Sequence, residues 1–280
     1  MASEVTTLAE YIRRIELRKA NPKEVRFYRG HANAGHTLQP GLFRQPQNRK
    51  HEKNLLRELV SLHPADFEMD TGVFEQLVRM QHYSLKTRLL DVSSNPLVAL
   101  YFACSPPYTD SGEVLYVAMS PSKVKYYDSD TVSCLANLAN LSGAERDSIR
   151  STKTDADLAA SPTGKRLLQF IKSEKPYFLP QIRRSDLNGP VAVKPRLKNR
   201  RLLAQQGAFL IFGLKTSLTD DGHDDFTIAR TIIPGAAKKK LRDSLDKIGI
   251  NASTMFPEIE SAANYIMSKV TPPADVETGT

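Results

Sequence analysis

The sequence predicts a single α+β domain in which helices flank one sheet and a helical segment is inserted. Short stretches rich in β-branched and aromatic residues alternate with longer stretches whose apolar residues recur at helical spacing. No internal repeat or low-complexity linker divides the 280 residues, so we expect one large domain. The contents of hydrophobic residues, 40%, and of charged residues, 25%, are those of an ordinary globular protein.

Helices are predicted where apolar residues recur every three or four positions. The run 97–103 is too apolar for a surface helix, so we expect a core helix there. Asn95 fits its N-cap and Pro96 its first residue. The predicted helices span residues 6–20, 51–62, 72–82, 97–103, 236–248 and 257–268.

Strands are predicted at four short apolar stretches bounded by Gly or Pro. Gly30 closes the first stretch, with Arg29 as its last residue, and Pro234 ends the fourth. The predicted strands span residues 25–29, 113–119, 208–212 and 226–233.

Two long segments fall outside these elements. Residues 130–175 have helical spacing but are more polar, which predicts a helical insertion or peripheral lobe. Residues 176–195 are basic and interrupted by prolines, which predicts a loop or edge structure. The expected organisation is an N-terminal helix within 1–24, a domain over 25–268 and a disordered tail at 269–280.

Cysteine and histidine spacing predicts no metal site. Cys104 and Cys134 form no CxxC pair and no His/Cys spacing suited to zinc, so we expect reduced thiols. No apolar run approaches the roughly 18 residues that span a membrane, and residues 1–20 lack a signal-peptide pattern. We therefore expect a cytoplasmic protein without membrane contact. The histidines predicted to lie on the surface or in loops are His31, His36, His51, His63 and His223.

Most of the net charge of +8 lies in one segment. Residues 181–215 hold eight Lys and Arg against one Asp, which gives this segment a net charge of +7. Clustered positive charge suits a polyanionic ligand such as a dinucleotide, a nucleic acid or a phosphorylated substrate. The alternative is a solvated basic face, and few aromatic residues stand in the segment to stack on single-stranded bases.

A dense polar cluster precedes the predicted core helix. Ionisable groups at the mouth of a buried helix are typical of an enzyme site, because a low dielectric shifts their pKa values. A capped loop whose polar groups satisfy one another is the alternative, and spacing alone favours neither. The cluster consists of Gln81, His82, Tyr83, Thr87, Arg88, Asp91, Ser93, Ser94 and Asn95.

Three motifs resemble those of one family. They are Phe27-Tyr28-Arg29-Gly30, then Gln81-His82-Tyr83 with Thr87-Arg88-Leu89-Leu90-Asp91, then Arg201-Leu202-Leu203-Ala204-Gln205-Gln206-Gly207-Ala208-Phe209. Their order is similar to that of the FRG domain, a bacterial and phage family named for its [FY]RG motif. Residues 249–257 also resemble the family's C-terminal pattern, so the resemblance covers roughly residues 25–268. One departure is Ser84-Leu85-Lys86, where the family usually has Gly-x-Pro.

The order of the motifs also resembles that of ADP-ribosyltransferase-like folds, which have one mixed or antiparallel sheet as their core. An Arg ends the first core strand, a polar motif adjoins an apolar helix, and a polar residue opens a late core strand. This fold-level resemblance implies an enzyme that takes NAD as its substrate and uses no metal. The implied acceptor is a protein or nucleic acid, and the implied context is a bacterial toxin or phage-defence effector.

The resemblance implies roles for the motif residues. Arg29 would contact phosphate or ribose oxygens, and His82 would bond a ribose hydroxyl or act as a general base. Gln206 would orient a ribose hydroxyl where related transferases place Glu. Because Gln lacks the negative charge that stabilises an oxocarbenium-like centre, this substitution puts catalysis in question, but not binding. Further candidates for ligand binding are Tyr28, Gly30 (for close backbone approach), Tyr83, Thr87, Arg88, Asp91 and Gln205, with Tyr83 or Tyr101 stacking on nicotinamide.

Alternatives stay open for the residues and for the function. One other function is a nucleic-acid-binding module that needs only phosphate contacts. Another is a nuclease or phosphotransferase that acts on RNA through His82 and the arginines. The structural alternatives are an ion pair of Arg29 with Asp91, a loop clasp of Arg88 with Asp91, a half-buried hydrogen-bonded His82, a Gln206 bonded to a neighbouring strand end, and core positions for Tyr101 and Phe102.

Overall fold

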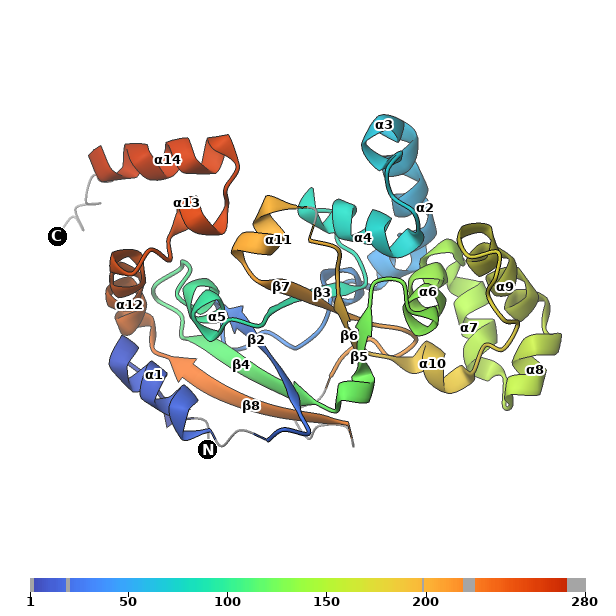
Figure 1. The fold of residues 1–280 in the computed structure, drawn as a ribbon, viewed down its shortest axis with the longest axis horizontal. Helices are drawn as coiled ribbons and strands as arrows, with labels where there is room; N and C mark the ends of the chain where they lie inside the picture. Colours follow the sequence, from blue (N-terminus) through green and yellow to red (C-terminus); the bar gives the residue numbers. More distant parts are fainter. Residues whose placement is uncertain (1–2, 19–20, 198, 219–224, 271–280) are drawn as a thin grey trace.

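Eight strands form one mixed sheet in the computed structural model, which describes residues 3–18, 21–197, 199–218 and 225–270 (Figure 1). The strand order is β1-β8-β4-β2-β3-β7-β6-β5. The outer pairs β1–β8 and β5–β6 are parallel, and the other neighbours are antiparallel. The strands are β1 (Ser3–Glu4), β2 (Val25–His31), β3 (Leu89–Ser93), β4 (Gly112–Met119), β5 (Val124–Tyr126), β6 (Val191–Lys194), β7 (Gly207–Ile211) and β8 (Phe226–Ile233).

Helices cover one face of the β1-β8-β4-β2 half of the sheet and gather in a separate lobe beside the other half (Figure 1). Short 3₁₀ turns occupy Gly41–Arg44, Pro121–Lys123 and Leu138–Asn140. The α-helices are α1 (Leu8–Leu17), α2 (Pro46–Leu62), α3 (Pro64–Phe67), α4 (Val73–His82), α5 (Pro96–Ala103), α6 (Asp130–Asn137), α7 (Gly143–Ser151), α8 (Asp155–Ala160), α9 (Pro162–Glu174), α10 (Arg184–Asn188), α11 (Arg200–Ala204), α12 (Gly235–Lys247), α13 (Ala252–Met255) and α14 (Ile259–Val270).

Helix α5 is the core helix that its apolar sequence predicts. The Asn95 side chain accepts a hydrogen bond from the Leu97 amide at 2.9 Å, which satisfies one free N–H of the first turn. Tyr101 is 2% exposed, so it is a core residue rather than a stacking platform, while Phe102 is only partly buried. Helix α1 begins after a capping box at Thr7 and ends at Leu17, and the predicted end at residue 20 lies outside the described residues.

The first core strand is longer than predicted. Strand β2 continues through Gly30 to His31, and it pairs with β4 from Val25↔Met119 to His31↔Glu113. Arg29 therefore lies inside a strand, opposite Leu115, and does not end it. Gly30 looked like a breaker in the sequence, but its backbone is extended and its lack of a side chain serves packing, as described below.

The basic segment 176–195 also differs from its prediction. It contains α10 and β6, and β6 lies between β5 and β7 rather than at the edge of the sheet. Pro190 and Pro195 flank β6, so neither removes a hydrogen bond from its ladder.

Residues 130–174 form α6 to α9, the lobe drawn in yellow-green in Figure 1. Leu135, Leu158, Leu167 and Ile171 are all 0% exposed, so this segment has its own buried interior. The same apolar cluster includes Phe209 of β7, which joins the lobe to the sheet. The first two residues of the tail predicted at 269–280 belong to helix α14, and residues 271–280 lie outside the described residues. None of the helices in the described part of the chain combines the length and apolar character needed to cross a bilayer.

Candidate functional site

The sheet opens between β2 and β3. These strands share one residue pair, Tyr28↔Ser93, whereas β2 pairs with β4 along its whole length. A hollow of about 160 Å³ lies at this opening, and we call it the inner hollow. Its lining consists of Tyr28, Arg29, Gly30, Asp91, Val92, Ser93, Val98, Ala99, Phe102, Arg201 and Gln205.

Arg29 is held at this opening by two protein contacts. Its Nε donates to His31 Nε2 at 2.9 Å, and its Nη1 donates to the backbone carbonyl of Asp91 at 2.6 Å. Among the described residues, no hydrogen-bond partner is found for the other three of its five N–H groups. Burial lowers the pKa of Arg29 and the Asp91 carboxylate opposes that change, but a guanidinium stays charged. Arg29 thus offers a fixed cation with unused donors.

The carboxylate of Asp91 faces the same hollow. Its Oδ2 accepts a hydrogen bond from Gln81 Nε2 at 2.8 Å and lies 4.0 Å from Arg29 Nη1. The Asp91 side chain is 60% exposed, so a ligand can reach it. Asp91 is the one carboxylate among the residues that line the inner hollow in the described part of the chain.

Gly30 packs tightly against α5. A Cβ atom at this position would stand 1.9 Å from the carbonyl oxygen of Ala99 and 2.6 Å from the Ala103 nitrogen, both in α5. Gly30 therefore allows close contact between β2 and α5, which forms one wall of the inner hollow. Gly30 also lines the inner hollow, and its predicted role in backbone approach to a ligand stays a prediction.

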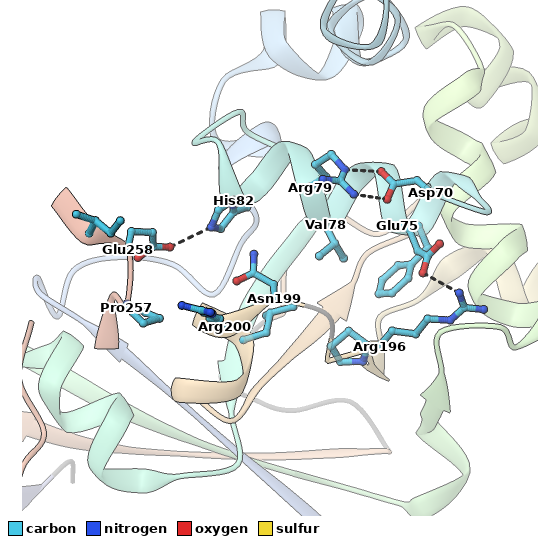
Figure 2. Close-up of a pocket in the computed structure, with 14 residues that line it drawn as sticks. Asp70, Glu75, Val78, Arg79, His82, Arg196, Asn199, Arg200, Pro257 and Glu258 are labelled. Atoms are coloured by element: carbon cyan, nitrogen blue, oxygen red, sulfur yellow. Dashed lines mark hydrogen bonds and ion pairs between the residues drawn. The ribbon is translucent and has the colours of Figure 1, made fainter. Parts of the chain in front are cut away.

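A second hollow of about 450 Å³ lies beside α4, and Figure 2 shows its side chains. We call it the outer hollow; its volume is within the range of small-molecule sites. Its charged side chains are mostly paired: Arg79 with Asp70 at 2.7 Å, and Arg196 with Glu75 at 3.5 Å. A narrow space of about 60 Å³ shares His82 with the outer hollow and Asp91, Arg201 and Gln205 with the inner one. The two hollows are therefore neighbouring parts of one surface.

The FRG domain model matches residues 24–111. The chain contains an FRG domain. No curated protein and no solved structure matches the chain. The match includes the first two motifs, so both Arg29 and Asp91 lie within the FRG domain, whereas the motif at residues 201–209 lies beyond the matched segment.

His82 lies at the junction of the two hollows, at the end of α4 in the FRG domain. Its Nε2 is 3.2 Å from Glu258 Oε1, which connects α4 to the C-terminal segment (Figure 2). The side chain is 26% exposed, so His82 is both half-buried and accessible from the outer hollow. Gln205 reaches the inner hollow from the end of α11, and its Nε2 donates to the Met255 carbonyl at 2.9 Å.

The structure places four other candidates away from the inner hollow. Arg88 is 0% exposed and bonds Glu52 and the Phe212 carbonyl, so it forms no clasp with Asp91. Thr87 is buried and donates to the side chain of Gln81, which in turn donates to Asp91. Tyr83 is 59% exposed and lines none of these spaces.

Gln206 also lies outside the lining of both hollows. Its φ of 45° places it in the left-handed region just before β7, and its carbonyl accepts a hydrogen bond from the Ser94 amide at 3.1 Å. Its side-chain oxygen lies 3.5 Å from Ser94 Oγ. The alternative that Gln206 bonds a neighbouring strand end therefore agrees with these contacts.

The basic segment 181–215 does not form one patch. Arg184 and Lys215 line a small space near α7 and α10, whereas Arg196 and Arg200 line the outer hollow. Lys198 lies outside the described residues. Figure 1 shows α10, which includes Arg184, and α11, which includes Arg200, on different sides of β6.

Sequence reasoning missed two residues behind Arg29. His31 was predicted to lie on the surface or in a loop, but it is 3% exposed and its Nδ1 lies 2.9 Å from Glu113 Oε1. The predicted strand ended at Arg29, whereas β2 continues to His31. Because residues two apart on a strand share a face, this continuation places His31 beside Arg29. Within the described residues, no group of three or more His, Cys, Asp or Glu side chains is arranged to hold a metal ion.

Proposed function

We propose that this protein is an ADP-ribosyltransferase-like enzyme that takes NAD as its substrate and modifies a macromolecular acceptor. The carrying observation is the placement of Arg29 and Asp91 together at the opening between β2 and β3. A fixed cation with unused donors suits the pyrophosphate, and a solvent-accessible carboxylate suits a developing positive charge.

Cleavage of NAD requires a negative charge near the ribose, and the neutral side chain of Gln206 cannot supply it. The bond between nicotinamide and ribose breaks, and nicotinamide leaves with the electron pair, so positive charge develops on the ribose. The nucleophile of the acceptor then bonds the ribose carbon and loses its proton to a base. In our proposal Asp91 supplies the stabilising negative charge, and His82, at the junction of the hollows, is the candidate base.

The sizes of the two hollows support a divided site. The inner hollow, at about 160 Å³, is too small for a whole dinucleotide, since sites for drug-sized ligands measure about 300–1,000 Å³. We propose that it takes the nicotinamide ribose and adjacent phosphate. Arg201 and Gln205 stand between it and the outer hollow, which would hold the rest of NAD or the acceptor.

The test is transfer of label from NAD into cell-extract protein, RNA or DNA, combined with direct measurement of NAD binding. We expect Arg29→Ala to weaken NAD binding, and Asp91→Asn to lower transfer on the order of a hundredfold while NAD still binds. Gln206→Glu should change little, because that side chain does not line the hollow. The matched control is Arg57→Ala, which removes an exposed arginine of α2. If the wild-type protein neither binds nor consumes NAD, the proposal fails.

A nucleic-acid-binding module without catalysis is the second candidate. One observation favours it: arginines line both hollows, namely Arg29, Arg79, Arg196, Arg200 and Arg201. Its binding to RNA should then fall by roughly 0.7 log units per tenfold rise in salt for each phosphate neutralised. Salt-sensitive RNA binding in the absence of NAD turnover would favour this candidate over the enzyme.

A further inference from the structure

Behind Arg29 lies a row of polar side chains on one face of three strands, and its central members, His31 and Glu113, are buried. His31 and Glu113 are direct cross-strand partners on β2 and β4, and Arg29 lies two residues before His31 on the same face. Arg230 of β8 completes the row by donating from Nη1 to Glu113 Oε2 at 2.5 Å. His31 is 3% exposed and Glu113 is 0% exposed, so water does not compete for these contacts.

The row defines the proton positions on His31. The Nε group of Arg29 is always a donor, so His31 Nε2 must accept at 2.9 Å. The ring proton is then on Nδ1, which donates to Glu113 Oε1 at 2.9 Å. A neutral His31 with its proton on Nδ1 satisfies both neighbours. A doubly protonated His31 would point an N–H at the N–H of Arg29.

The same contacts orient the guanidinium of Arg29. His31 engages Nε on one side, and the Asp91 carbonyl engages Nη1 on the other. The guanidinium plane is thereby fixed by two strands, β2 and β3, at the point where they part. The charge of Glu113 is shared with Arg230, and the carboxylate that lies near Arg29 is that of Asp91 in the inner hollow, 4.0 Å from Nη1.

We propose that His31 is a positioning residue, which with Glu113 fixes Arg29 so that its remaining N–H groups face an anionic ligand group. This inference rests on the proposed function only for the identity of the ligand, the pyrophosphate of NAD. Burial lowers the pKa of His31 below its ordinary value, the hydrogen bond to Glu113 opposes this, and the charge of Arg29 lowers it further. The other groups that face His31 are Glu113 and His36, whose ring centroid is 5.9 Å away.

The test compares two substitutions. In His31→Gln, the amide oxygen can accept from Arg29 and the amide nitrogen can donate to Glu113; in His31→Leu, neither contact remains. With NAD and inorganic pyrophosphate as probes at pH 7.5, we expect His31→Leu to bind up to about a hundredfold more weakly. His31→Gln should stay within a few fold of the wild type. Equal binding by His31→Leu and the wild type overturns the inference.

A pH profile separates positioning from a purely structural role. Wild-type binding should weaken as the pH falls through the pKa of His31, which burial holds below its ordinary value, because protonated His31 no longer accepts from Arg29. His31→Gln should lack this acid limb, and an unchanged limb in this variant contradicts the inference. If His31→Leu fails to fold, this comparison decides the matter.

A ligand-free readout keeps the inference separate from the proposed function. In the nitrogen NMR spectrum at pH 7.5, His31 should show a neutral ring with its proton on Nδ1, and the Nε–H of Arg29 should be protected from exchange. This result, together with no NAD binding, would reject NAD as the ligand but retain the positioning contact. A proton on Nε2 would overturn the inference whether or not NAD binds.

Discussion

Arg88 and Glu52 form an ion pair that is closed off from solvent. Arg88 Nε lies 2.7 Å from Glu52 Oε1 and Nη2 lies 2.6 Å from Oε2, and the two side chains are 0% and 3% exposed. Arg146 Nη1 lies 3.1 Å from the same Oε2, so one carboxylate balances two guanidiniums. Arg88, predicted as a ligand contact, thus joins the start of β3 to Glu52 of α2, which also pairs with Arg146 of α7.

Replacing Arg88 should therefore affect stability before it affects binding. We expect Arg88→Met to lower the free energy of unfolding by about 3–5 kcal/mol, because it leaves buried polar groups without their partner. Urea titration at pH 7 measures the change. Arg57→Met, on the exposed side of α2, is the control and should stay within about 0.5 kcal/mol of the wild type. If the Arg88→Met protein had normal stability but no longer bound NAD, Arg88 would be a ligand-binding residue and this prediction would be wrong.

Gly30 should tolerate no side chain. The clash of a Cβ atom with the Ala99 carbonyl, at 1.9 Å, forces α5 away from β2, so we expect Gly30→Ala to cost about 3 kcal/mol or more. Thermal unfolding would record the loss. Gly143→Ala is the matched control, because its nearest neighbour, the Lys50 Cα, is 3.7 Å away, and it should change stability by less than about 1 kcal/mol. A Gly30→Ala protein as stable as the control would contradict the packing described for α5.

Ser84 occupies a position that favours glycine. Its φ is 66°, and the Leu85 amide bonds the Met80 carbonyl at 3.0 Å, as expected for a Schellman ending of α4. Helix α12 ends in the same way with Gly249, whose φ is 81°. We expect Ser84→Gly to raise the free energy of unfolding by roughly 0.5–1 kcal/mol. Ser84→Ala keeps the left-handed strain and should give no gain in the same urea titration.

Both thiols should be unreactive in the folded protein. Burial raises the pKa of Cys104 to about 12 and that of Cys134 to about 12. At pH 8 each group is then a thiol rather than the nucleophilic thiolate. A colorimetric disulfide reagent should detect no thiol in the native protein and both after denaturation. Fast reaction of either cysteine at pH 8 without unfolding would contradict the buried positions.

The elements could be predicted because their signals are local. The Asn95-Pro96 start and the apolar run define α5, and Pro234 directly follows the last residue of β8. The strand β6 could not be found in this way, because its prolines stand just outside its ladder. The two-residue strand β1 pairs with β8 across most of the chain and has no local signal.

The site could be predicted in part, because it combines local motifs with distant contacts. Arg29, Asp91 and Gln205 come together in the inner hollow as the motif order suggested. The partner of Arg88, however, is 36 residues away, and the partner of His31 is 82 residues away. Charge and spacing in the sequence identify an arginine or histidine as a candidate. Whether its side chain faces the hollow or the interior depends on the register of the strands, which the sequence motifs do not contain.

Because β2 and β3 share the single pair Tyr28↔Ser93, few backbone hydrogen bonds hold the two halves of the sheet together. Arg29 belongs to the half of the sheet that holds β4 and β8, whereas Arg201 and Gln205 precede β7 in the other half. A ligand bound to both halves would hold β2 and β3 together at the boundary where the two halves share the fewest backbone hydrogen bonds. We call this boundary the seam. At a hundred times its Kd it would add about 2.7 kcal/mol to the folded state. Amide hydrogen exchange in β2 and β3 should slow more than exchange in the distant lobe of α7 to α9, which makes the seam itself a reporter of occupancy.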